Sequence, residues 1–474
     1  MPTPSPLPSL LRQWLVAGAG ILVLLATPPA SGEALAQTPA PEAVDRELAL
    51  ETFDMAWSRI AETWWDPEMT GLDWDGVRTE LRPRAAEAET ADELRAVIRA
   101  LLGRMGESHF VLLPGDAAEA LEREDGPVGE ADPGLELRLV DGRFVVTRVR
   151  AGSKAGEEGI RPGWVLTHVD GEALSEILDA LHGPLGDADP ALLALHASTR
   201  AMARLRGPEG EALPLRLLDG EDEPVELAPT RGAPAGERVQ FGHLGPLQVW
   251  VTDSVVRTPP GPDSPDGLQV GVLGMSAWFP VVAAPVAEAV DRFRELDGIV
   301  LDLRGNPGGV AALAMGVGGH FLDDGEALGE MRTRDGVLRF VTNPRRISTD
   351  GRRVSPFSGP MAILVDGLSA STSEIFAGGL QGLGRARVFG EPTAGQALPA
   401  VISTLPNGDR IMHAVADYRG PGGIRFEGRG VEPDVLASWN RGDLLSGRDP
   451  ALDAALNWLA THPQTSPDST DNEP

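Results

Sequence analysis

The spacing of hydrophobic residues divides the chain into regions with different repeats. From about residue 45 to residue 103, apolar side chains such as Phe53 and Trp57 recur at helical spacing, which predicts amphipathic helices. Thr90 stands three residues before Glu93, a spacing typical of a capping box at the start of a helix. This region is therefore expected to form a small helical subdomain.

A second pattern, of short strands and glycine turns, covers residues 127–232. Apolar residues alternate with polar ones over Leu135–Leu139, as in a half-buried strand. Asp141–Gly142 then turns the chain into the strand-like segment Phe144–Val146. The alternation predicts a separate β module.

Strand and helix patterns alternate beyond the proline-rich segment 258–267. Such alternation predicts a mostly parallel sheet covered by helices, an α/β fold. A last helix, Asp449–Leu459, precedes a polar tail. The strands are expected at Leu268–Leu273, Gly298–Leu303 and Met361–Val365, and the helices at Val282–Leu296, Val310–Phe321 and Ser371–Leu383.

The beginning of the chain has the order of a secretory signal. Arg12 precedes an apolar run of 13 residues, Trp14–Ala26, and the small residues Ala34 and Ala36 follow it. The run is short for a membrane span, which needs roughly 20 apolar residues. We interpret residues 1–36 as a signal peptide, the alternative being an uncleaved anchor. Its removal would leave a periplasmic or secreted protein without integral membrane contact.

Composition excludes several classes of function. Acidic residues outnumber basic ones by 70 to 41, and the formal net charge is -29. A surface of that sign repels phosphate backbones, so nucleic acid is not expected as a partner. The absence of cysteine excludes disulfides, thiolate nucleophiles and cysteine-type zinc sites. No metal-ligand spacing is present, and neither a metal nor another cofactor is expected.

Ser371 occupies a turn that suits a nucleophile. The buried-looking strand Met361–Val365 leads through this turn directly into a helix. A hydroxyl at that point lies beside free N–H groups and the positive end of the helix dipole, where an oxyanion would be stabilised. The alternative is structural, because Ser371 and Glu374 also have the spacing of a capping box.

The glycine-dense loop Asp302–Gly309 is a second candidate site element. Such loops can direct successive backbone N–H groups into one cavity. The alternative is a tight strand-to-helix turn in which Asn306 favours the bend.

Parts of residues 127–232 resemble a PDZ domain. Residues 134–137 stand where that fold keeps its peptide-carboxylate loop, and Gly159–Asp170 resembles its glycine turn, although Trp164 replaces the usual acidic residue. Such a loop offers free N–H groups and an open strand edge to an extended peptide end. The alternative is a β module without a ligand. The peptide-binding residues implied are Gly134, Leu135, Glu136 and Leu137.

Together, and in order along the chain, these segments resemble the tail-specific, or C-terminal processing, serine peptidases and their tricorn-core relatives. The resemblance implies a crotonase/ClpP-like α/β peptidase core with an N-terminal helical subdomain and an inserted PDZ-like β domain. The matching segments are Asp73–Trp74, Ser108–His109, the PDZ-like module, Asp302–Gly309, Ser369–Ala377, Gly390–Gly395 and Gly430–Asp434.

The residue patterns and the resemblance together divide the chain into five parts. They are a signal peptide (1–36), the helical subdomain (37–126), the PDZ-like domain (127–232), the α/β peptidase core (233–445), and a C-terminal helix with a polar tail (446–474).

The resemblance also implies roles for individual residues, with Ser371 as nucleophile. Peptidases of the Ser–Lys type keep a lysine where this chain has Gln396, and an amide cannot accept a proton near neutral pH, so that dyad is excluded. The tricorn-like branch implies His109 as the base, oriented by Glu427 through the Ser108 hydroxyl. The implied oxyanion-hole donors are the backbone N–H groups of Gly308, Gly309 and Thr372.

The expected function is that of an exported serine endopeptidase acting on unfolded or C-terminal polypeptide segments. The only lysine, Lys154, lies in the PDZ-like module, too remote in sequence to be the base. His413, near Asp417, is an alternative base. A second reading is an inactive peptide- or hydrophobic-ligand-binding protein on the same scaffold, and a third is a PDZ-led adaptor. The oligomeric state is not indicated by the sequence.

Overall fold

The computed structural model describes residues 43–115, 131–185, 190–239, 247–260 and 264–462. The expected signal peptide (1–36), the expected boundary at residues 126 and 127, and the end of the polar tail lie outside the described residues. Within these ranges, no helix is both long enough and apolar enough to cross a membrane.

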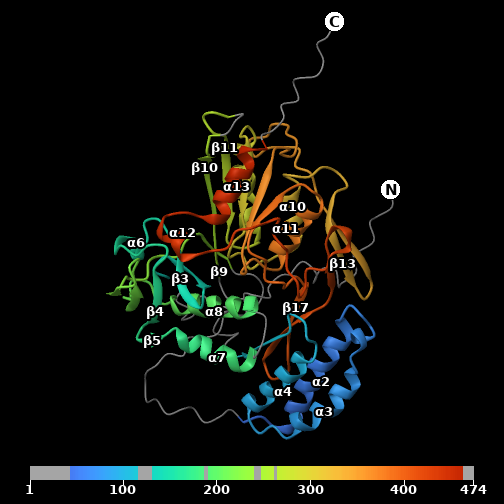
Figure 1. The fold of residues 1–474 in the computed structure, drawn as a ribbon. Coiled ribbons are helices and arrows are strands. Elements are labelled where there is room, and N and C mark those ends of the chain that lie inside the picture. The colour runs from blue at the N-terminus through green and yellow to red at the C-terminus, as the bar shows by residue number, and fades with distance from the viewer. Residues whose placement is uncertain (1–42, 116–130, 186–189, 240–246, 261–263, 463–474) are drawn as a thin grey trace, which may run out of the picture.

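The centre of the molecule is a six-stranded sheet in the order β10-β11-β12-β15-β16-β20 (Figure 1). β11, β12, β15, β16 and β20 run parallel, and β10 joins one edge in the antiparallel direction. The predicted α/β class is confirmed at this level. The strands are β10 (Val251–Arg257), β11 (Gln269–Met275), β12 (Gly298–Asp302), β15 (Met361–Val365), β16 (Arg387–Gly390) and β20 (Val435–Leu436).

Helices cover both faces of this sheet. Because successive strand residues point to opposite faces, Ile299 and Leu301 join the hydrophobic cluster of α9, α10 and α11, whereas Val300 joins the cluster of α13. α10 is shorter than the expected Val310–Phe321. The helices are α9 (Ala283–Phe293), α10 (Ala312–Gly318), α11 (Thr372–Gly382) and α13 (Pro450–Ala460).

Three helices near the N-terminus share a hydrophobic core of their own. Each begins at a polar cap, and Thr90 Oγ1 accepts the N–H of Glu93 at 3.3 Å. The Glu93 carboxylate returns to the N–H of Glu89 at 2.8 Å, one residue before the partner that a capping box predicts. The helices are α2 (Arg46–Thr63), α3 (Trp74–Ala86) and α4 (Ala91–Gly103).

A small sheet joins these helices to the rest of the molecule. Its order is β1-β18-β17, so a strand that follows α4 pairs with strands near the end of the chain. Leu398 and Ile411 belong to the helical core, and Arg95 of α4 forms an ion pair with the buried Asp409 at 2.9 Å. The strands are β1 (Val111–Leu113), β17 (Ala400–Thr404) and β18 (Arg410–Ala414).

The strands of residues 131–232 form a separate sheet in the order β2-β3-β4-β6-β7, with β5 beside β4. Two longer helices, α7 and α8, accompany it, although the alternation in the sequence did not indicate them. The elements are β2 (Leu135–Val140), β3 (Arg143–Val149), α6 (Lys154–Glu157), β4 (Val165–Val169), β5 (Glu172–Ala173), α7 (Ser175–Leu185), α8 (Pro190–Arg204), β6 (Leu215–Leu218) and β7 (Pro224–Leu227).

The remaining elements connect these units. Leu444 of α12 packs into the small cluster formed by the β2, β3 and β4 valines. The elements are β8 (Glu237–Val239), β9 (Leu247–Val249), β13 (Ala327–Thr333), β14 (Gly336–Val341), β19 (Asp417–Arg419), α12 (Arg441–Leu445), and the 3-10 turns η3 (Met69–Gly71), η4 (Pro280–Val282) and η5 (Pro421–Gly423).

Because His413 is buried between α2 and β18, we expect the contact between these two elements to weaken as the pH falls. Its ring nitrogens meet Thr63 Oγ1 at 3.2 Å and Ser403 Oγ at 3.0 Å, and burial lowers the pKa of His413 to about 4. The unfolded histidine takes up its proton near pH ~6.5. The stabilisation is therefore present above about pH 6.5 and is lost as the pH falls toward about 4.

We expect the free energy of unfolding of the wild type, relative to His413→Gln, to fall by roughly 3 kcal/mol over that range. Urea denaturation of both proteins at several pH values measures this difference. Parallel pH curves for the two proteins would contradict the expectation.

Candidate active site

Ser371 lies in a strained turn between β15 and α11. Its backbone angles, φ +53° and ψ -116°, fall in a region that non-glycine residues rarely adopt. Its N–H donates to Gln396 O and to Glu374 Oε2, both at 2.9 Å. The side chain is nearly buried. Surrounding contacts therefore hold the hydroxyl at the start of the helix, as the sequence pattern indicates.

Glu374 collects donors from both sides of this turn. Besides the Ser371 N–H, its carboxylate accepts Thr393 Oγ1 at 2.6 Å, Gly395 N at 2.8 Å and Gln396 N at 2.9 Å. Burial raises the pKa of Glu374 to about 7, although these hydrogen bonds oppose the rise. The sequence indicated only a helix cap here. The structure shows that Glu374 also fixes the 393–396 loop against the Ser371 turn.

The glycine loop packs directly on Ser371. Gly308 has φ +100° and Gly309 has φ +146°, conformations that favour glycine. A Cβ on Gly308 would lie 2.7 Å from Ser371 Cβ and 3.0 Å from Thr372 N. The loop is closed by Asn306, whose Oδ1 accepts Gly308 N at 3.0 Å and whose Nδ2 donates to Met275 O at 2.9 Å.

The three predicted oxyanion donors differ in their hydrogen bonding. The Gly308 N–H is occupied by Asn306. The N–H groups of Gly309 and Thr372 donate to no acceptor within the described residues. Two unpaired donors thus flank Ser371, one from the loop and one from the helix start, as anion binding by backbone amides requires.

Ser108, His109 and Glu427 form a hydrogen-bonded chain in which His109 and Glu427 are buried and Ser108 is half-buried. Ser108 Oγ lies 2.5 Å from His109 Nδ1 and donates to Glu427 Oε2 at 3.0 Å, while Ser108 N donates to Glu427 Oε1 at 2.8 Å. Burial lowers the pKa of His109 to about 4 and raises the pKa of Glu427. The imidazole is therefore neutral at pH ~7, as proton acceptance requires.

The outer nitrogen of His109 has no partner in the part of the chain that the structure describes. Nε2 is buried and makes no hydrogen bond with any described residue, Ser371 included. The backbone of residues 396 and 397 links Ser371 to Glu427 instead. Ala397 N donates to Glu427 Oε2 at 2.8 Å, and the preceding Gln396 O accepts Ser371 N. His109 itself has φ +63°. The structure thus brings Ser371 and Glu427, the hydrogen-bond partner of Ser108, to one short segment, Gln396–Ala397.

Lys154, which the sequence excluded as the base, and His413, the alternative base, have other partners. Lys154 pairs with Glu157 at 2.9 Å on α6, in the PDZ-like region. His413 is buried between Thr63 and Ser403. Their contacts identify them as an exposed ion pair and a packed, hydrogen-bonded core residue.

The residues expected to bind peptide do not present an open edge. Gly134 N donates to Asp132 Oδ1 at 2.5 Å, and Leu137 N lies 3.1 Å from Met202 Sδ. Leu135 is buried in the β2–β3 pairing, and Glu136 forms an ion pair with Arg148. The expectation of free N–H groups is corrected here. The physical reason is that α8 covers the β2 edge, where Ser198 Oγ also accepts Leu139 N at 3.0 Å.

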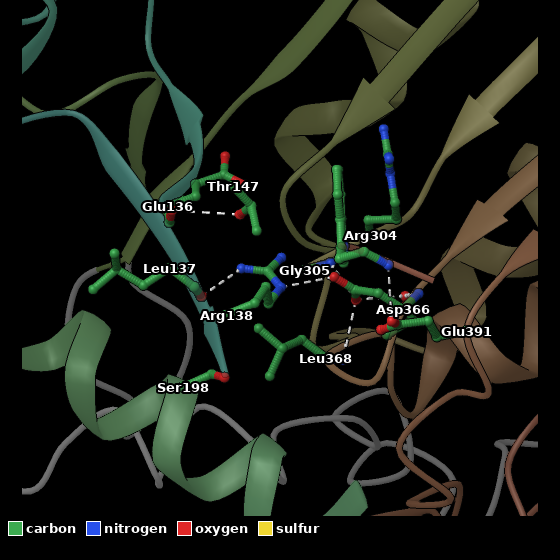
Figure 2. Close-up of polar contacts among 12 residues, drawn as sticks. Glu136, Leu137, Arg138, Thr147, Ser198, Arg304, Gly305, Asp366, Leu368 and Glu391 are labelled. Carbon is green, nitrogen blue, oxygen red and sulfur yellow. Dashed lines mark hydrogen bonds and ion pairs between the residues drawn. The ribbon is translucent and has the colours of Figure 1, made fainter. Parts of the chain in front are cut away.

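β2 is also tied to the turn that carries Ser371 (Figure 2). Arg138 Nε donates to Asp366 Oδ2 at 2.8 Å, and both side chains are nearly buried. Asp366 Oδ1 accepts Gly305 N at 2.8 Å and Leu368 N at 3.0 Å. This carboxylate therefore joins three segments: the sheet that contains β2, the glycine loop and the turn before the helix. No sequence motif indicated the contact.

Because Gly308 lies so close to Ser371, adding a methyl group at position 308 should destabilise the protein. Gly308→Ala places its Cβ against Ser371 and keeps a positive φ, so we expect a loss of at least about 2 kcal/mol of stability. In the matched control, Gly316→Ala, the Cβ meets nothing within 4 Å and stabilises the helix by up to about 1 kcal/mol. The urea denaturation midpoints of the two variants and the wild type measure both changes in stability. Equal midpoints would contradict the assigned packing.

Two family models match the chain. The description "Peptidase family S41" covers residues 269–437, and "Tricorn protease C1 domain" covers residues 47–103. The first range contains Ser371 and Glu427, and the second contains α3, α4 and all of α2 except Arg46.

Curated relatives match most of the chain. A carboxyl-terminal-processing peptidase 3 of Arabidopsis thaliana chloroplasts is 26% identical over 405 residues, which cover 83% of this chain and 70% of the relative. A carboxyl-terminal-processing protease of Synechocystis is 25% identical over 432 residues, which cover 90% of each. Among solved structures, the photosystem II D1 C-terminal processing protease superposes with a TM-score of 0.55 at 21% identity, covering 87% of this chain and 97% of that one.

Proposed function

We propose that this chain cleaves unfolded or C-terminal polypeptide segments with Ser371, His109 and Glu427. The proposal starts from the finding that the chain carries a peptidase family S41 domain and a tricorn protease C1 domain and is a serine-type peptidase. The observation that carries this assignment is the hydrogen-bonded chain Glu427–Ser108–His109, which ends on a buried Nε2 without a partner among the described residues. A buried polar atom without a partner is costly in a purely structural role.

The hydrogen-bond directions fit a base at Nε2. Ser108 Oγ donates to Glu427, so the same oxygen can accept the proton on His109 Nδ1. That tautomer leaves a lone pair on Nε2. Nε2 would take the Ser371 proton as the hydroxyl attacks the peptide carbonyl, and would return it to the leaving amine.

The oxyanion would lie between the N–H groups of Gly309 and Thr372. Each such donor contributes roughly 2.7–4 kcal/mol to the transition state in serine peptidases. Gly308 has a different part in this proposal. Its missing side chain admits Ser371, and its N–H holds the loop through Asn306.

Two finer properties complete the proposal. Residues 127–232 would act as a PDZ-like domain that takes the ends of extended polypeptides between β2 and α8, once the α8 side chains withdraw from the β2 edge. Residues 1–36 would direct export to a periplasm or the exterior. The rival, a binding protein without catalysis, is less favoured because the complete Ser108–His109–Glu427 chain has no role in it.

Substitution of the nucleophile or the base tests the catalytic assignment. We expect Ser371→Ala and His109→Ala each to reduce the kcat for casein or an unstructured peptide by about 10⁴-fold or more. A fluorophosphonate probe should label the wild type on Ser371 and should not label Ser371→Ala. Peptide mass mapping locates the label.

The control is His462→Ala, which removes an exposed histidine at the end of α13 and should leave hydrolysis unchanged. Wild-type rates in both site variants would reject the assignment. A wild type that binds peptide but neither cleaves nor reacts with the probe would favour the binding protein.

The closed β2 edge gives a test of the PDZ-like role. Ser198→Ala frees Leu139 N for a peptide carbonyl, and one such hydrogen bond is worth about 1 kcal/mol. In a Ser371→Ala background, we therefore expect a fluorescent peptide with a free, apolar C-terminal residue to bind about fivefold more tightly. Anisotropy measures the Kd.

Two controls accompany this measurement. Ser254→Ala on the exposed β10 should not change the Kd, and the C-terminal amide of the same peptide should bind more weakly. An unchanged Kd in Ser198→Ala would argue against peptide addition along β2.

A further inference from the structure

We propose that Arg425 is a positioning residue, which clamps the segment carrying Ser108 and His109 against the segment carrying Glu427. The inference rests on the proposed function, because it concerns the orientation of the same imidazole. It adds a residue to which neither the sequence pattern nor the family resemblance assigned a role.

Arg425 bridges two carboxylates with different parts of its guanidinium. Nη2 donates to Glu107 Oε1 at 2.8 Å, and Nε donates to Asp417 Oδ1 at 2.9 Å. Asp417 is fully buried on β19, and its other oxygen accepts Arg419 Nε at 2.8 Å. The guanidinium is thus fixed from the β19 side and reaches across to Glu107.

The clamp runs parallel to the functional hydrogen bonds. Glu107 immediately precedes Ser108, and Arg425 stands two residues before Glu427. The same two segments are therefore joined twice, once by Glu107–Arg425 and once by Ser108–Glu427. Two adjacent cross-links fix both the register and the angle between segments, whereas one would act as a pivot.

His109 requires such a constraint because its backbone is strained. It has φ +63°, a conformation that is unfavourable for a non-glycine residue and persists only where neighbouring contacts impose it. β1 pairing holds the chain on the C-terminal side, with Val111 opposite Met412. The Glu107–Arg425 ion pair supplies a second anchor on the N-terminal side. Without it, the segment can relax and turn Nε2 away.

The charge of Arg425 serves the same arrangement. Burial raises the pKa of Glu427, and the nearby Glu107 carboxylate adds to the rise. Arg425 places a cation beside Glu107, which offsets that repulsion. Lysine could not replace both functions, because a single ammonium cannot present two N–H groups in the fixed, planar arrangement that reaches Glu107 and Asp417 together.

Three variants test the clamp. Arg425→Met removes both ion pairs, Arg425→Lys keeps the charge, and Glu107→Gln weakens the link from the other side. The matched control is Arg419→Met, since Arg419 is about as exposed as Arg425 and pairs with the same Asp417 without touching Glu107. kcat and KM for an unstructured peptide, and the fluorophosphonate labelling rate of Ser371, are measured for each.

We expect Arg425→Met to lower kcat and the labelling rate by about 10–100-fold with KM nearly unchanged, since misplacement by about 1 Å costs that much. Arg425→Lys should recover part of the loss, and Glu107→Gln should lower kcat in the same direction. Arg419→Met should remain within about twofold of the wild type. Should Arg425→Met fail to fold, Glu107→Gln decides, because it leaves the Arg425–Asp417 ion pair in place.

Equal kcat values for Arg425→Met, Glu107→Gln and Arg419→Met would overturn the inference, as would a loss confined to KM. The proposed function fails separately, through an unlabelled Ser371 in the wild type or an active His109→Ala. If the wild type is active and labelled, and Arg425→Met has the same kcat and labelling rate as the wild type, the clamp is rejected and the proposed function is not.

Discussion

The arrangement of the site depends on one buried carboxylate, that of Glu374. Four donors converge on it, from the Ser371 turn and from the loop that contains Gln396. Burial alone would favour its protonated form, and the convergent hydrogen bonds favour the charged one. The strained backbone of Ser371 is retained because these bonds, together with the Gly308 contact, leave it no alternative.

Strain is shared among the segments that meet here. Positive φ values occur at Ser371, His109, Gly308 and Gly309. Hydrogen bonds to other segments hold the chain at or next to these residues, such as Ser371 N to Gln396 O and Ser108 N to Glu427. The backbone of Gln396–Ala397 connects Ser371 with Glu427, since Gln396 O accepts Ser371 N and Ala397 N donates to Glu427. In the Ser–Lys branch this position would carry the base. Here its backbone, rather than its side chain, contributes to the site.

Local patterns in the sequence were sufficient for three strands of the central sheet, β11, β12 and β15, and for the Ser371 turn, because each depends on residues close together in the chain. β15 is found where the apolar run indicated, and α11 begins at Thr372, beside the expected Ser371. The Ser108–His109–Glu427 contacts were indicated only by a family resemblance, since no local pattern links residues 319 positions apart. Arg138–Asp366 and Arg425–Glu107 had no signal at all. Each pairs an ordinary arginine with an ordinary acid, and only the tertiary fold selects the pair.

The pairing of β1 with β18 has a consequence for biogenesis. The core of the first three helices includes Leu398 and Ile411, so the earliest part of the chain to be synthesised cannot complete its packing until the end is available. At translation rates of about 5–20 residues per second, the 319 positions between Ser108 and Glu427 correspond to roughly 16–64 s. The hydrogen bonds among Ser108, His109 and Glu427 can therefore form only after that interval, when the last third of the chain has been synthesised.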